Sequence, residues 1–83
     1  MNYRLSLDLE ALRFLFAVSV ADRRSLMGWL ERLKSTPFST GQSIVLDPTG
    51  REIQVSKFSR FRIFHWTDHA VETVRVVKIE LND

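Results

Sequence analysis

The spacing of apolar residues changes about halfway along the chain, from a helical period to a strand period. Between residues 9 and 33, apolar side chains recur every three or four positions, which is typical of helices with one buried face. From residue 44 onward, apolar and polar residues alternate, which is typical of β-strands. Residues 3–7 also alternate and predict a short first strand. The pattern predicts two helices that follow one strand and precede several others.

The first predicted helix begins after Asp8, whose carboxylate can cap free backbone N–H groups. Its apolar positions are spaced by three and four residues: Leu9, Leu12, Leu15 and Phe16. The apolar run 14–18 is also compatible with a buried strand.

The second predicted helix is capped by Ser19 or Asp22 and ends near Ser35, because Pro37 cannot continue it. Gly28 is unfavourable inside a helix, which indicates that another segment approaches the backbone there. The apolar stripe consists of Leu26, Met27, Trp29, Leu30 and Leu33. The short connection between the two helices predicts a helical hairpin.

The second half of the chain predicts strands separated by turns. The segment Asp47-Pro48-Thr49-Gly50 is a turn, because proline presets one dihedral angle and glycine admits a positive φ. It joins strands at 44–46 and 53–57, and further strands follow at 58–67 and 71–81 around a hairpin loop at 67–70. The phase of the last strand changes near Val76, which indicates either a β-bulge or burial first on one side and then on the other.

The predicted element order is β-α-α-β-β-β, an α+β fold. An antiparallel sheet of about four strands carries the helical hairpin on one face. Residues 1–83 form a single domain. The sequence has neither a long apolar run nor the features of a signal peptide, so we expect a cytoplasmic protein without a membrane span. The chain has no cysteine, which excludes disulfides and thiolate metal sites.

The net charge of +2 does not by itself indicate a nucleic-acid-binding protein, but the distribution of charge adds a candidate surface. Residues 51–62 contain four cationic side chains and one acidic one, Glu52, which gives a local charge of 4 − 1 = +3. These cations are Arg51, Lys57, Arg60 and Arg62. They form either a solvated strand face or a surface for an anionic partner. Arg60 and Arg62 are two residues apart and are expected on one side of a strand.

Three polar side chains near the last predicted turn suggest acid–base chemistry. His65 and His69 are titratable near neutral pH, and Asp68 supplies a neighbouring carboxylate. The alternative is that Asp68 bonds the backbone of the turn. Two histidines four residues apart share a face on a helix and not across a turn, so no metal site is predicted. The sequence also lacks nucleophile-elbow and phosphate-loop motifs, and no cofactor is predicted.

Three further side chains have two interpretations each. Met27 and Trp29 are either part of the core or line a groove for a partner segment. Trp66, beside Phe64, is either a packed aromatic residue or a platform on which a nucleobase stacks.

The chain resembles the RelE/ParE superfamily of toxins from type II toxin–antitoxin systems, over nearly its whole length. The resemblance rests on the short first strand, the helix pair ending in "DRRSLMGWLERLKSTPF", the "DPTGREIQV" hairpin and the strand pair "FSRFRIFHWTDHAVETVRVVKIEL". The last segment is similar to a subgroup of bacterial ParE/RelE-like proteins.

This resemblance implies a toxin that inhibits either translation or DNA gyrase. Its expected partner is an antitoxin protein, which binds it through an acidic segment of the antitoxin. RelE-like members cleave mRNA on the ribosome without metal, and Arg60 and Arg62 match their basic sheet residues. Arg51 and Lys57 are further candidates for this surface. The chain ends Glu80-Leu81-Asn82-Asp83, without the late arginine and tyrosine or histidine of those ribonucleases. This departure favours either a ParE-like target or a non-toxic module that only pairs with a protein partner; the oligomeric state is left open.

Overall fold

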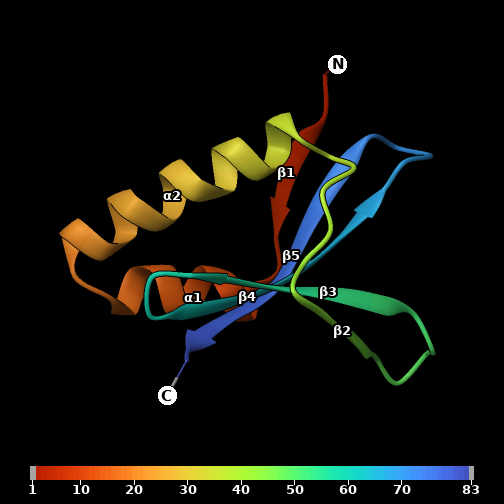
Figure 1. Ribbon diagram of the computed structural model, residues 1–83. Coiled ribbons are helices and arrows are strands. Elements are labelled where there is room, and N and C mark those ends of the chain that lie inside the picture. Colours follow the sequence, from red (N-terminus) through yellow and green to blue (C-terminus); the bar gives the residue numbers. More distant parts are fainter. Residues whose placement is uncertain (1, 83) are drawn as a thin grey trace.

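The computed structural model describes residues 2–82 and has an α+β fold, as predicted (Figure 1). The elements in chain order are β1 (Arg4–Leu7), α1 (Leu9–Ala17), α2 (Val20–Ser35), β2 (Ser43–Leu46), β3 (Glu52–Phe58), β4 (Phe61–Asp68) and β5 (Thr73–Leu81). The five strands form one mixed sheet in the order β1-β5-β4-β3-β2. β1 runs parallel to β5 and the other pairs are antiparallel. All five segments expected as strands form, so the predicted order β-α-α-β-β-β and its count of about four strands are one strand short. The sheet is also not wholly antiparallel as expected, because β1 is parallel to β5.

Both helices pack against the same face of the sheet, and they lie over its β1–β5 side (Figure 1). We call this the helix face and the opposite side the open face. Leucines from α2 and the residues Ala11 and Leu15 of α1 meet alternate residues of the central strands. The buried core consists of Tyr3, Ala11, Leu15, Leu26, Leu30, Leu33, Phe61, Ile63, Val74, Val76 and Ile79. Alternate strand residues point to opposite faces, so this core also fixes which side chains reach the open face.

The helix ends are satisfied by side chains that the sequence places close by. Ser19 is the N-cap of α2, and its hydroxyl accepts the Asp22 N–H at 3.1 Å, as expected. Asp8 is the N-cap residue of α1, but its side chain makes no capping bond. At the other end of α1, the Arg23 guanidinium donates to the carbonyls of Leu15 (2.7 Å), Phe16 (3.3 Å) and Val18 (3.4 Å). Arg23 therefore links the two helices through carbonyls that α1 leaves free.

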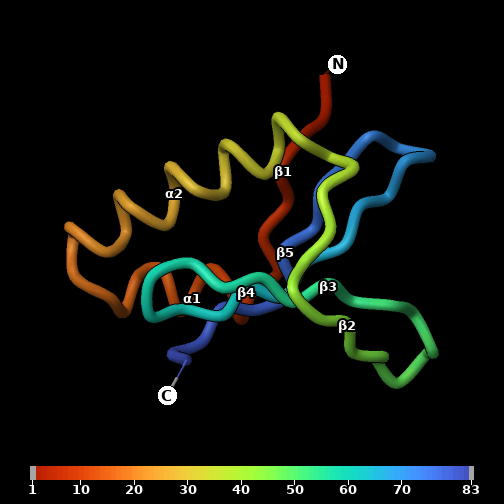
Figure 2. The backbone as a smooth tube through the Cα atoms, viewed as in Figure 1, coloured from red at the N-terminus to blue at the C-terminus, as the bar shows by residue number. Residues whose placement is uncertain are grey.

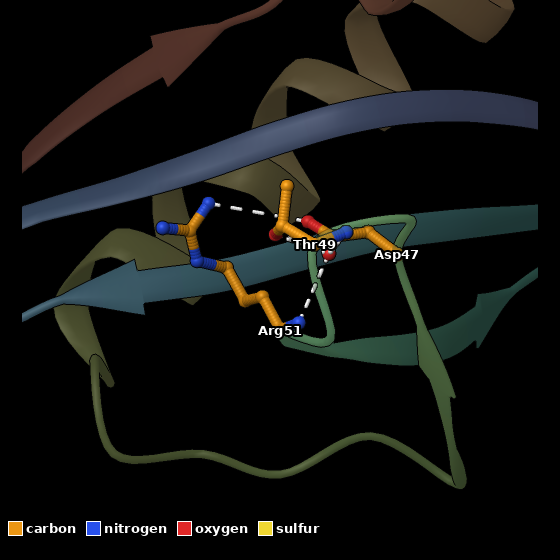
Figure 3. Close-up of polar contacts among 3 residues, drawn as sticks. All are labelled: Asp47, Thr49 and Arg51. Carbon is orange, nitrogen blue, oxygen red and sulfur yellow. Dashed lines mark hydrogen bonds and ion pairs between the residues drawn. The ribbon is translucent and has the colours of Figure 1, made fainter.

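The turn between β2 and β3 forms as predicted (Figure 3). The Asp47 carboxylate accepts the Thr49 N–H (2.9 Å), the Thr49 hydroxyl (2.6 Å) and the Arg51 N–H (2.9 Å). These bonds, the hydroxyl first, lower the pKa of Asp47 because they favour its charged form. Gly50 adopts a positive φ of 84°, which is the conformation that glycine admits.

Two predicted strand boundaries are wrong. Phe58 ends β3 and does not begin β4, because Ser59 and Arg60 form a tight turn between them. Ser59 has a φ of 55°, a region that non-glycine residues rarely occupy, so its sequence gave no turn signal. β4 extends through Asp68, and the β4–β5 loop is 69–72.

The predicted irregularity in the last strand is a β-bulge. Phe64 lies opposite Lys78, whereas the next residue, His65, lies opposite Val76. Val77 therefore has no partner in β4. The bulge lets β5 direct Val76 and Ile79 to the same face, which explains the change of apolar phase.

The segment between α2 and β2 crosses the sheet beside β3 (Figure 2). Gln42 bonds β3 twice: its N–H donates to the Val55 carbonyl (2.9 Å), and its side-chain oxygen accepts the Lys57 N–H (2.8 Å). A Cβ atom at Gly41 would lie 2.5 Å from that same carbonyl oxygen. The expectation of close approach at Gly28 is wrong, since a Cβ there would meet only the tip of Arg32 at 3.9 Å. Gly41 is the glycine that close packing requires.

Replacing each of these two glycines by alanine should have opposite effects on stability. We expect Gly41→Ala to lower the free energy of unfolding by about 1–3 kcal/mol, because the β3 backbone must move. Gly28→Ala, the matched control, should raise it by about 0.5–1 kcal/mol through helix propensity. Urea denaturation measures both. Equal effects of the two substitutions would contradict this account of the crossing segment.

Candidate functional site

The open face of β3, β4 and β5 carries cations and aromatic rings. Residues directly opposite each other in an antiparallel ladder share a face. The register therefore places seven side chains together, namely Lys57, Arg62, Phe64, Trp66, Arg75, Lys78 and Glu80. Arg51, at the end of the β2–β3 turn, reaches over the same face. Ile53 and Val55 of β3 are buried although they point away from the helices, so this surface layer covers a small apolar cluster of its own.

Two guanidinium groups lie close to the ring of Trp66. The Arg51 guanidinium carbon lies 3.9 Å from the centre of the Trp66 ring, and that of Arg75 lies 5.7 Å away. Phe64 has a similar neighbour, because the Lys78 ammonium is 4.6 Å from its ring centre. Cations over aromatic faces are stabilised by the ring quadrupole. They are therefore oriented before any partner arrives.

Arg62 occupies the middle of this face. It bonds Glu80 at 2.6 Å, and Lys78 lies 3.6 Å from the same carboxylate. Lys57 lies directly opposite Arg62 on β3 and is exposed. The Arg62 Nε is buried and has no hydrogen-bond partner among residues 2–82. Glu80 thus neutralises only part of the positive charge that Arg62, Lys57 and Lys78 bring together.

Arg60 does not belong to this face. It lies in the β3–β4 turn, and its guanidinium pairs with Asp22 at the start of α2. The expectation that Arg60 and Arg62 project to one side of a strand is wrong, because the turn separates them. The two arginines instead contact opposite sides of the sheet.

His65 lies in the core and not in an accessible site. It is 2% exposed, its Nε2 is 2.8 Å from the Ser56 hydroxyl, and the Trp29 ring packs edge-on against it. Burial lowers its pKa to about 4, because the charged imidazolium loses its water. The interpretation of His65 as an acid–base residue is therefore wrong: it is neutral and inaccessible at physiological pH.

His69 is in a separate aromatic cluster at the β4–β5 loop. Its Nδ1 lies 2.7 Å from the Tyr3 hydroxyl, and its ring stacks on Phe38 with centroids 4.6 Å apart. The Asp68 carboxylate accepts the Ala70 N–H at 3.2 Å, so it bonds the loop backbone as the alternative interpretation had it. The structure does not bring His65, Asp68 and His69 together as a catalytic group. Tyr3 was missed because its partner is 66 positions away in sequence.

Trp29 and Met27 are mainly packing residues. Trp29 stacks on Phe58 with ring centres 6.0 Å apart, and Met27 is half-buried against the core. A hollow lies elsewhere, between the α1–α2 connection, the β3–β4 turn and the end of β5. It measures about 590 Å³ and includes Phe14, Val18, Phe61 and Leu81, with the Arg60–Asp22 pair at its margin. Sequence reasoning missed it because its walls come from three segments that are far apart in the chain.

Residues 2–82 bring together no group of three or more His, Cys, Asp or Glu side chains that could bind a metal ion. Within the same residues, neither helix is long and apolar enough to cross a membrane.

Comparison with known proteins places the fold. No family model matches the sequence, and no curated protein is significantly similar to it. Solved structures of RelE toxins do match. The Mycobacterium tuberculosis RelBE2 toxin–antitoxin complex contains a chain with a TM-score of 0.80 and 13% identity, covering 98% of this chain and 99% of that chain.

Two further structures agree with the first. For the archaeal RelE–RelB complex from Pyrococcus horikoshii, the TM-score is 0.77 at 12% identity, over 99% of this chain and 97% of that one. For the isolated E. coli RelE toxin, the TM-score is 0.76 at 17% identity. The match covers 99% of this chain and 86% of that one. The chain therefore has a RelE-like fold, as its sequence suggested.

The burial of His65 predicts a specific dependence of stability on pH. Its pKa is about 4 in the folded chain and near 6.5 when unfolded, so its stabilising effect is complete above pH 6.5. As the pH falls, the unfolded chain binds this proton first. The free energy of unfolding should therefore drop by about 2 kcal/mol between pH 6.5 and roughly 5, and continue to drop toward pH 4.

Urea denaturation over this pH range measures the effect. His65→Gln, which keeps a side chain able to bond Ser56, should flatten the pH dependence. His69→Gln, the matched control, should keep the pH dependence of the free energy of unfolding that His65 produces. If His65→Gln leaves the slope unchanged, the buried imidazole is not its source.

Proposed function

We propose that this chain is the toxin-like component of a type II toxin–antitoxin system and that its open face contacts the target. The observation that carries this proposal is the cationic and aromatic open face on a RelE-like fold. Of the two targets considered, translation is favoured over DNA gyrase. Guanidinium groups bind phosphates in a bidentate geometry, so the cations of this face fit the phosphate backbone of RNA.

An antitoxin with an acidic segment is the proposed partner. The RelE structures similar to this chain include complexes of toxins with antitoxins. An acidic segment across Lys57, Arg62 and Lys78 would neutralise these cations and cover the surface that contacts RNA. Inhibition would then follow from direct competition for the same charges.

The chemistry of mRNA cleavage requires a separate test. Neither histidine faces the open face, and the single tyrosine, Tyr3, bonds His69 at the β4–β5 loop. Arginine and lysine side chains remain available to stabilise the charge of a phosphate during displacement. The alternative function is a binding module that pairs with a protein partner and does not arrest growth.

Controlled expression in bacteria distinguishes these functions. We expect growth arrest and a fall in protein synthesis, which pulse labelling measures. Mapping the 5′ ends of mRNA then separates cleavage from simple occupation of the ribosome. Normal growth at good levels of folded protein would contradict the toxin-like role. Inhibited gyrase with unaffected protein synthesis would contradict the choice of target.

Reversing two open-face charges should abolish the effect without unfolding the chain. The double variant Lys57→Glu/Arg75→Glu removes cations that make no ion pair among residues 2–82. The matched control is Arg13→Glu/Arg24→Glu, which makes the same change in net charge at exposed positions on the helices.

We expect the open-face variant to lose growth arrest and to bind single-stranded RNA with a salt dependence shallower by about two ion contacts. The helix variant should behave like the unmodified chain. Fluorescence anisotropy at several salt concentrations measures the binding, and circular dichroism verifies the fold. Equal losses in both variants would indicate a general charge effect and would contradict a defined surface.

A further inference from the structure

β2 is an edge strand that lacks the usual protection. It lies at the end of the sheet order and, among residues 2–82, pairs with β3 alone (Figure 1). All four of its residues are exposed, including Ile44 (51%), Val45 (43%) and Leu46 (68%). Natural edge strands usually carry a charge, a proline or a covering segment, which prevents pairing with other chains. β2 contains neither a charge nor a proline. The opposite edge, β1, carries Arg4 and is contacted by α2.

The hydrogen-bonding groups that β2 leaves free follow from its register. The Asp47 N–H bonds the Arg51 carbonyl at 3.0 Å, which makes that pair a hydrogen-bonded one. Bonded and non-bonded pairs alternate along an antiparallel ladder, so Val45 exchanges its bonds with Ile53. The backbone groups of Ile44 and Leu46 then point outward, away from β3. Two residues with free donors and acceptors flank Val45 symmetrically.

We propose that β2 pairs with β2 of a second copy of this chain, antiparallel and centred on Val45. In this register Ile44 of each copy lies opposite Leu46 of the other, and both pairs exchange backbone hydrogen bonds. Val45 lies opposite Val45 of the second copy, in a pair that exchanges no backbone hydrogen bonds. The strand is therefore complementary to itself in backbone groups and in apolar side chains, and the two sheets become continuous.

The distribution of charge favours a second copy over a charged partner. Each copy carries a net charge of +2, yet no residue of Ser43–Leu46 is ionisable. The first ionisable residue beyond the strand, Asp47, lies opposite Ser43 of the other copy, so no like charges face each other. An acidic partner would find no cation on this edge. The contact involves only four residues per copy, so a weak, reversible dimer is expected. This inference is independent of the proposed function.

Disulfide trapping tests the register directly, because the chain has no cysteine of its own. Val45→Cys should form a covalent dimer under mild oxidation, since directly opposed residues lie within the distance that a disulfide spans. Ile44→Cys is the matched control on the same exposed strand. In the proposed register the two residues at position 44 are diagonal neighbours, about 7–8 Å apart, so Ile44→Cys chains should not be linked to each other. A mixture of Ile44→Cys and Leu46→Cys chains should be linked, although neither chain is linked alone.

Sedimentation measures the dimer without cross-linking. We expect the mass of the unmodified chain to rise with concentration. Val45→Lys, which places two ammonium groups opposite each other, should remain monomeric over the same range. Val71→Lys, at an exposed apolar position in the β4–β5 loop, should dimerise normally. Equal linking of Val45→Cys and Ile44→Cys, or a monomer at every concentration, would overturn the proposal. A monomer whose β2 is protected from hydrogen exchange only when an antitoxin is bound would also overturn it and would assign this edge to the antitoxin.

Discussion

The parallel pairing of β1 with β5 is the contact on which the rest of the structure depends. Leu5 lies beside Val74 and Leu7 beside Val76, and backbone bonds at both ends of β1 fix its position. Because α1 begins immediately after β1, this pairing sets where the helical hairpin starts and which face it covers. It joins residues about 70 positions apart, so closing the chain costs entropy that local structure does not recover. Burial of the α2 leucines in one core with Val74 and Val76 of β5 offsets this entropy.

A single strand, β4, contributes alternate residues to the core and to the open face. Successive residues of β4 point to opposite faces, so Phe61, Ile63 and His65 enter the core while Arg62, Phe64 and Trp66 reach the open face. A shift of the register by one residue would bury Arg62 and expose Ile63. The bulge at Val77 preserves this separation on β5, where Val76 and Ile79 must both face the helices. The position of the cations is therefore a consequence of how the core is packed.

Much of this arrangement could be predicted from the sequence, because local patterns encode it. The helical stripe, the Ser19 cap, the Asp47–Gly50 turn and the bulge all depend on residues within a few positions of one another. Arg60 shows where such reasoning fails: a turn formed by Ser59 has no glycine or asparagine to mark it, and the Asp22 partner is distant. His65 and His69 looked alike in sequence. Their tertiary contacts distinguish them: Trp29 packs edge-on against His65, and the Tyr3 hydroxyl bonds His69.

The stacking of Arg51 on Trp66 affects the energetics of the open face beyond its charge. A free arginine loses side-chain entropy when it binds a phosphate, and this loss weakens binding. Here the ring already restricts the guanidinium, which still has its hydrogen-bond donors in the plane of the group. Asp47 lies 4.0 Å from the same guanidinium and limits its movement further. A lysine at position 51 would retain the charge but lose planar stacking and bidentate geometry. The turn that Asp47 organises therefore also orients the cation that the open face presents.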